Sequence, residues 1–111
     1  MTTVTYDREN YAIDIRGHAG CGKAGQDLIC SAVSILMWTL VDCVMAEADF
    51  GARWIKKEDV PLSAVRCYPD KRLTKRCRVI MDTIADGFAL LAAHYPQYVS
   101  YKQTGGADND A

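Results

Sequence analysis

The chain has 111 residues, enough for one domain, and 50% of them are hydrophobic, which is ordinary for a soluble protein. Its net charge of −1 argues against a protein whose main task is to wrap nucleic acid or coat an anionic membrane. No secretory signal stands at the N-terminus, and the longest uncharged apolar stretch, residues 28–41, is shorter than a bilayer span. We therefore expect a cytoplasmic protein with one domain over residues 1–102 and a disordered tail over residues 103–111.

Residue periodicity predicts an α+β fold with two layers, a small mixed or antiparallel sheet packed against two main helices. Alternation of apolar and polar residues indicates short strands over residues 2–6, 11–16, 53–56, 64–68 and 98–102. The first two strands flank a turn and should form a hairpin. Helical spacing indicates helices over residues 28–46 and 74–94, and Asp27 is suited to cap the first of them.

The two helices differ in their apolar faces. The second is amphipathic, and its solvent face should carry Lys75, Arg78, Asp82 and Asp86. The first is apolar almost all round, with only a thin polar stripe made of Ser31, Ser34, Trp38 and Asp42. A single sheet cannot cover such a helix, so we predict that it packs against its own copy in a homodimer.

The five cysteines give no sign of a disulfide framework, because their number is odd and no two form a C-x-x-C pair. His18 and Cys21 are three positions apart, but no second close ligand pair accompanies them, so we expect no metal.

Residues 17–25 hold four glycines and form a loop between the predicted hairpin and the first helix. Gly17, Gly22 and Lys23 fit a phosphate-binding pattern, but Ala24 replaces the hydroxyl residue that would hold magnesium. A dinucleotide pattern also fits the glycines, but no acidic residue follows a second strand at the required distance.

Cys30 and His18 support a third interpretation of the same segment. Cys30 falls in the first turn of the predicted helix, where backbone N–H groups and the helix dipole favour a thiolate. His18 leaves the hairpin just before the loop, which is long enough to bring its imidazole to the sulfur. A Cys–His pair is the minimal unit for covalent acyl transfer. Spacing leaves open the alternative that Cys30 is a small core residue and His18 an ordinary loop residue.

Two runs of the sequence resemble a known family. The run Gly17-His18-Ala19, followed by residues 25–34 (GQDLICSAVS), is similar to the paired motifs of the ribosomal-processing cysteine protease family, Prp. Residues 87–99 resemble the closing helix, turn and strand of that family. The resemblance covers about a third of the chain directly.

The resemblance implies an α+β homodimer that acts as a cysteine endopeptidase without metal or cofactor. It implies Cys30 as the nucleophile and His18 as the general base. The implied protein substrate is the N-terminal extension of the large-subunit ribosomal protein numbered twenty-seven. Asp27 also matches the motif, but helix capping accounts for it, and we assign it no catalytic role.

Residues 49–70 depart from the family pattern, so a related protease that processes a virion protein stays open as an alternative. Cys21 is an addition in the loop, and a disulfide with Cys30 would silence the nucleophile. A non-enzymatic ribosome- or RNA-binding module is the rival class, and it would use the only basic cluster, Lys71, Arg72, Lys75, Arg76 and Arg78. Such a cluster at the start of an amphipathic helix is also typical of solvated surface.

Overall fold

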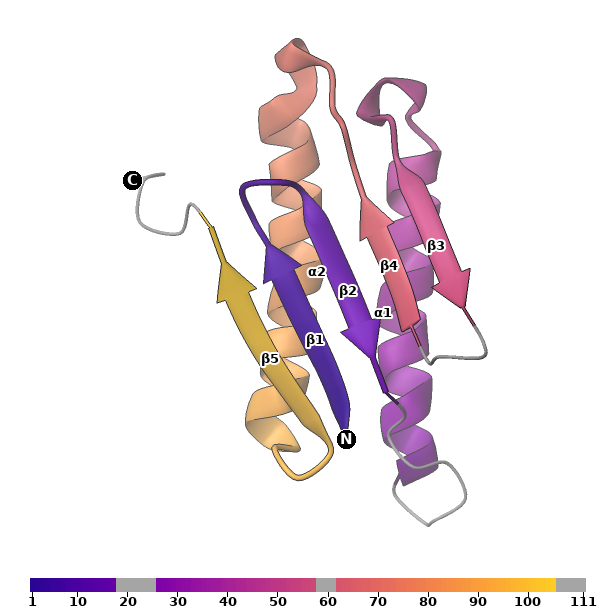
Figure 1. Cartoon of the computed structure of the whole chain (residues 1–111), viewed down its shortest axis with the longest axis vertical. Helices are drawn as coiled ribbons and strands as arrows, with labels where there is room; N and C mark the ends of the chain where they lie inside the picture. The colour runs from indigo at the N-terminus through magenta and orange to yellow at the C-terminus, as the bar shows by residue number, and fades with distance from the viewer. Residues whose placement is uncertain (18–25, 58–61, 106–111) are drawn as a thin grey trace.

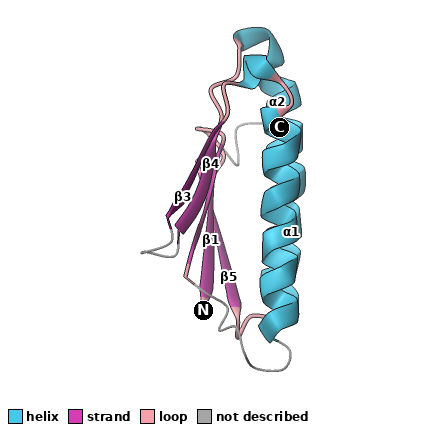
Figure 2. Ribbon diagram, turned by 90° about the vertical axis from the view of Figure 1, so that its right-hand side faces the viewer, coloured by secondary structure: helices cyan, strands magenta, loops and turns pink. Residues whose placement is uncertain are grey.

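The computed structural model describes residues 1–17, 26–57 and 62–105. A five-stranded sheet forms one layer, and two long helices lie together on one face of it (Figures 1 and 2). The strands are β1 (Thr2–Asp7), β2 (Ala12–Arg16), β3 (Arg53–Lys57), β4 (Leu62–Arg66) and β5 (Val99–Thr104). Their order is β3-β4-β2-β1-β5, and only β1 and β5 are parallel. The predicted two-layer α+β fold is confirmed.

The helices are α1 (Gln26–Met45) and α2 (Thr74–His94), with short 3-10 turns η1 (Ala48–Phe50) and η2 (Lys71–Leu73). The bounds of α2 agree with the prediction. Helix α1 begins earlier than predicted, so Asp27 is its second residue and the prediction of Asp27 as N-cap was wrong. Strand β4 begins and ends two residues earlier than predicted, because its ladder with β2 stops at Arg66, opposite Ala12.

The core lies between the sheet and the helices. Residues of β1, β2 and β4 that point toward the helices are buried, among them Val4, Ile13, Ile15 and Val65. Helix α2 meets them with a stripe that recurs every three or four residues, as predicted, made of Cys77, Met81, Ile84 and Phe88. Strand β5 continues through Thr104, two residues beyond the predicted domain end, while residues 106–111 lie outside the described part of the chain.

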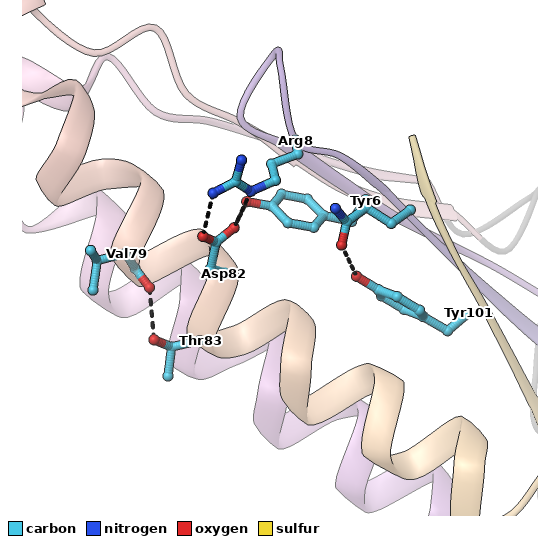
Figure 3. Close-up of polar contacts among 7 residues, drawn as sticks. Tyr6, Arg8, Val79, Asp82, Thr83 and Tyr101 are labelled. Carbon is cyan, nitrogen blue, oxygen red and sulfur yellow. Dashed lines mark hydrogen bonds and ion pairs between the residues drawn. The ribbon is translucent and has the colours of Figure 1, made fainter. Parts of the chain in front are cut away.

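Two residues predicted to face solvent from α2 instead contact the β1–β2 hairpin. Asp82 accepts hydrogen bonds from Tyr6 Oη at 2.6 Å and from Arg8 Nε and Nη2, both at 2.9 Å (Figure 3). The guanidinium of Arg78 lies 4.7 Å from the ring centre of Tyr11. Periodicity within a helix cannot reveal this arrangement, because the partners reach over from the hairpin.

These contacts decide the charge state of the Asp82 carboxyl. Burial works to raise its pKa, but the hydrogen bonds from Arg8 and Tyr6 and the nearby positive charges outweigh burial and hold the pKa below its usual value. The buried Tyr6 hydroxyl changes in the opposite sense, since burial and its bond to Asp82 both raise its pKa. Asp82 therefore fastens α2 to the hairpin as a carboxylate.

Helix α1 has one buried face and one exposed apolar face. The buried face carries Ile29, Val33, Met37, Leu40 and Val44. Large apolar side chains stand exposed on the other side, namely Leu28, Ile35, Trp38 and Met45. One chain therefore leaves this stripe uncovered, and the dimer that would cover it stays a prediction.

The segment Leu28–Met45 of α1 has a mean hydropathy of 2.0 and is long and apolar enough to cross a membrane. This window is longer than the uncharged stretch of residues 28–41 because it continues past Asp42. Helix α1 nevertheless packs into the core beside α2, where Gly87 leaves room for Leu36. A Cβ on Gly87 would lie 2.7 Å from Leu36 Cδ2. The core helix of a soluble protein can be this long and apolar. The packing of α1 against the sheet and α2 is typical of such a helix.

Candidate active site

Cys30 is the fifth residue of α1, rather than the third as predicted. Its own N–H therefore belongs to the helical ladder, and the direct effect of unpaired N–H groups on the thiol is smaller than the sequence suggested. The Cα–Cβ bond of a helical residue tilts toward the helix N-terminus. The Cys30 side chain therefore still leans toward the first turn, where the dipole favours negative charge.

The Cys30 side chain is half-buried and packs at the margin of the core. It lies about 120° around the helix from Leu36, which contacts α2, so it points away from α2. On that side of the molecule lie β4 and the edge strand β3 (Figure 1). Trp54 of β3 pairs with buried Val65 and so faces the helix layer, yet it is 39% exposed. The helices therefore leave part of β3 uncovered on the flank to which Cys30 belongs.

Gly17 fixes the point at which the chain leaves β2 toward His18. Its φ is +83°, and a Cβ there would lie 2.5 Å from the carbonyl oxygen of Met1. Only glycine fits this position without strain. The sequence pattern marked Gly17 as a motif residue, but the close approach to Met1 is visible only in three dimensions.

Residues 18–25 lie outside the described residues, and this part of the glycine-rich segment includes His18, Cys21 and Lys23. What the structure places is the two ends of that segment. The end of β2 and the beginning of α1 stand at the same end of the molecule (Figure 1). The described residues on either side of residues 18–25 therefore lie at the end of the molecule to which Cys30 belongs.

The other described cysteines differ from Cys30 in their surroundings. Cys67 and Cys77 are buried and hydrogen-bonded to each other, and that bond together with burial raises the pKa of the Cys67 thiol. Cys43 is exposed near the far end of α1. Among the described cysteines, Cys30 alone combines partial burial with a place near a helix N-terminus.

The basic cluster at the start of α2 is largely occupied by contacts within the chain. Arg72 forms ion pairs with Asp49 and Asp70, and Arg76 approaches Glu47 at 4.0 Å. Arg78 packs on Tyr11, as described above. These contacts favour a structural role for the cluster over the RNA binding of the rival hypothesis.

The nucleotide-binding interpretations of the glycine segment find no support in the sheet. Both neighbours of β2, the strand before the segment, are antiparallel to it. Dinucleotide sites are built on mostly parallel sheets. Within the described ranges, no group of three or more His, Cys, Asp or Glu side chains is placed to hold a metal ion.

Comparison with known proteins gives one family and several similar folds. The family model described as cysteine protease Prp matches residues 1–100. The crystal structure of SMU.848 from Streptococcus mutans is 24% identical, with a TM-score of 0.78 and 94% of each chain covered.

Two structures of a protein from S. aureus, described as an essential ribosomal processing protease Prp, are each 16% identical and cover 94% of this chain and 100% of that one. The structure with a covalently linked product peptide has a TM-score of 0.76, and the structure with a substrate peptide has 0.75. None of the curated proteins matches the chain.

Proposed function

Because the chain belongs to the cysteine protease Prp family and is a cysteine protease, we propose that it removes a short N-terminal extension from the large-subunit ribosomal protein numbered twenty-seven. The observation that carries the proposal is the family match over residues 1–100. The similar fold of the S. aureus protease, which is described as ribosomal processing, supports the choice of substrate class.

Cys30 is the proposed nucleophile and His18 the proposed general base. The Cys30 thiol gives its proton to His18 and the sulfur attacks the scissile carbonyl, so that a C–S bond forms as the C–N bond breaks. His18 then passes the proton to the leaving amine. Water hydrolyses the thioester and releases the extension with a new carboxylate. The partial exposure of Cys30 and its place near the beginning of α1 support this role.

The protease works in the cytoplasm as a homodimer in this proposal. The exposed stripe on α1, made of Leu28, Ile35, Trp38 and Met45, supports the dimer, because a second copy of α1 would cover it. Light scattering that gives the mass of a monomer at micromolar concentration would contradict this part of the proposal.

The test is the intact mass of the extended ribosomal protein after mixing with the protease. The wild-type chain should shorten the substrate, whereas Cys30→Ala and His18→Ala should leave it whole. Cys43→Ala is the matched control, since Cys43 is exposed near the other end of the same helix, and it should cleave like wild type.

Two other outcomes have distinct meanings. Cleavage by Cys30→Ala would remove Cys30 from the mechanism. No cleavage by the wild type, although iodoacetamide alkylates Cys30 quickly at neutral pH, would overturn the proposed substrate and direct the search to another protein, such as a virion component.

A further inference from the structure

The sheet face that points away from the helices carries a cluster of cations over β3, β4 and β2. Ile13, Ile15 and Val65 face the helices, and so does Trp54, which pairs with Val65. Side chains alternate between the two faces of a sheet, so the neighbours of these residues along each strand face outward. In the register of the sheet, Arg53 stands opposite Arg66, while Lys57 and Arg16 stand on either side of Leu62. Together with Tyr68, which contacts two of them, these residues form what we call the basic face: Arg16, Arg53, Lys57, Arg66 and Tyr68.

The charges of the basic face are mostly unmatched within the described residues. Among its cations, Arg16 alone forms an ion pair with a carboxylate of the described residues, at 3.8 Å from Asp14. The carboxylates of Asp49 and Asp70 are engaged by Arg72. The net charge of −1 therefore hides an uneven distribution, with cations gathered on one uncovered face.

The Arg53–Arg66 pair is the most informative part of the basic face. Like charges directly opposite each other on a sheet lower its stability. Tyr68 stands between the two, with its ring centre 4.7 Å from the guanidinium of Arg66 and 5.9 Å from that of Arg53. Cation–π contact offsets part of the repulsion. An anion bound by both guanidinium groups would offset the rest.

Tyr68 is held in place although it is 53% exposed. Its backbone N–H donates to the Phe50 carbonyl at 2.8 Å, and the left-handed Gly51 allows that segment to approach closely. A Cβ on Gly51 would lie 2.9 Å from the Tyr68 carbonyl oxygen. The backbone that carries the ring is thus held in place, and the ring contacts both guanidinium groups.

We propose that the basic face binds single-stranded RNA, with Arg53 and Arg66 on phosphates and the Tyr68–Arg66 stack against a base. Planar guanidinium and aromatic surfaces are what nucleobases stack on, and arginine binds phosphate through two N–H groups. An acidic peptide would use the charges but not the ring. The inference goes beyond the proposed function, and RNA binding does not require the substrate proposed above.

The test is fluorescence anisotropy of a labelled single-stranded RNA of about 16 nucleotides and mixed sequence, titrated with the full chain. The charge-reversal variant is Arg53→Glu with Arg66→Glu. This pair lies about 13 Å along the strands from Lys57 and Leu62, the described residues at the other end of the β3–β4 ladder. The matched control is Lys71→Glu with Lys75→Glu, an equal charge change on two exposed residues of the basic cluster.

The wild type should bind the RNA, and its affinity should fall as salt is raised. The Arg53/Arg66 variant should bind at least about tenfold more weakly, and its log–log salt slope should be smaller by about 1.4, which corresponds to two lost phosphate contacts. The Lys71/Lys75 control should change affinity less than about twofold. Tyr68→Phe should bind like wild type, and Tyr68→Leu should bind several-fold more weakly.

Four outcomes would overturn the proposal. The wild type fails to bind RNA up to about 100 μM at low salt. The two charge-reversal variants lose equal affinity. Tyr68→Leu binds like wild type. Polyglutamate displaces the RNA at equal charge, which would favour an acidic protein partner. Circular dichroism of every variant confirms folding, and cleavage is measured separately, so failure of the protease proposal cannot be mistaken for failure of RNA binding.

Discussion

Replacing Asp82 by Asn removes the charge that holds α2 to the β1–β2 hairpin while it keeps a side chain of the same size. Three hydrogen bonds reach the Asp82 carboxylate, one from Tyr6 and two from Arg8. Hydrogen bonds to a charged group contribute about 1.5–3 kcal/mol each. The Asp82 side chain is 39% exposed, however, so solvent screens the interaction. In the variant, the amide oxygen of the new Asn side chain still accepts one hydrogen bond. We expect the free energy of unfolding to fall by about 1.5 kcal/mol.

For a chain of this size, that loss lowers the melting temperature by roughly 6 °C. Asp86→Asn is the matched control, because Asp86 is an exposed residue one turn further along α2. Surface changes of this kind alter stability by less than about 0.5 kcal/mol. Thermal unfolding at neutral pH separates the two. Equal melting temperatures for both variants would refute the stabilising role of the Asp82 network.

The pH dependence gives a second readout of the same network. The folded-state pKa of Asp82 lies below its usual value of 3.8, so the unfolded chain takes up the proton first as pH falls. The stabilisation is complete at neutral pH and is lost as pH drops below that value. The difference in unfolding free energy between wild type and Asp82→Asn should therefore narrow in acid. A difference that stays constant between pH 7 and about pH 2 would contradict the assigned cause.

Three further predictions concern other parts of the molecule. Gly17→Ala should lower the unfolding free energy by about 2 kcal/mol, since φ is +83° and the new methyl meets Met1, and a melting temperature equal to wild type would contradict this. Ile35→Glu should give a monomer in light scattering where the wild type gives a dimer, whereas Leu90→Glu, on exposed α2 surface, should not. Iodoacetamide should leave the buried Cys67 unmodified until the protein is unfolded, so rapid native labelling would contradict its raised pKa.

Local sequence patterns predict the elements of this fold well where the signals are strong. Helix α2 has the bounds that its periodicity and Pro96 indicate, because apolar residues recur at every turn between two breaks. Helix α1 begins earlier than Asp27 suggested, since residues before a favourable capping residue can still take helical geometry. Arg78 and Asp82 were misplaced because their partners, Tyr11, Arg8 and Tyr6, lie far away in the sequence.

The candidate site could be predicted only in part. Spacing alone favoured a small core residue at Cys30 over a nucleophile, and the similarity of two motifs to a protease family decided its assignment. The steric need for Gly17 depends on a contact with Met1, which the sequence cannot show. The basic face depends on the register of three strands, whose cations are scattered between residues 16 and 66.

The most direct test of Cys30 as the nucleophile is the mass of the enzyme itself during turnover. Mixing with the extended ribosomal protein and quenching in acid should trap a thioester. Its mass equals that of the wild-type chain plus the extension, less one water, and digestion should map the adduct to Cys30. An adduct on another residue, or the same adduct in Cys30→Ala, would contradict the assignment of the nucleophile.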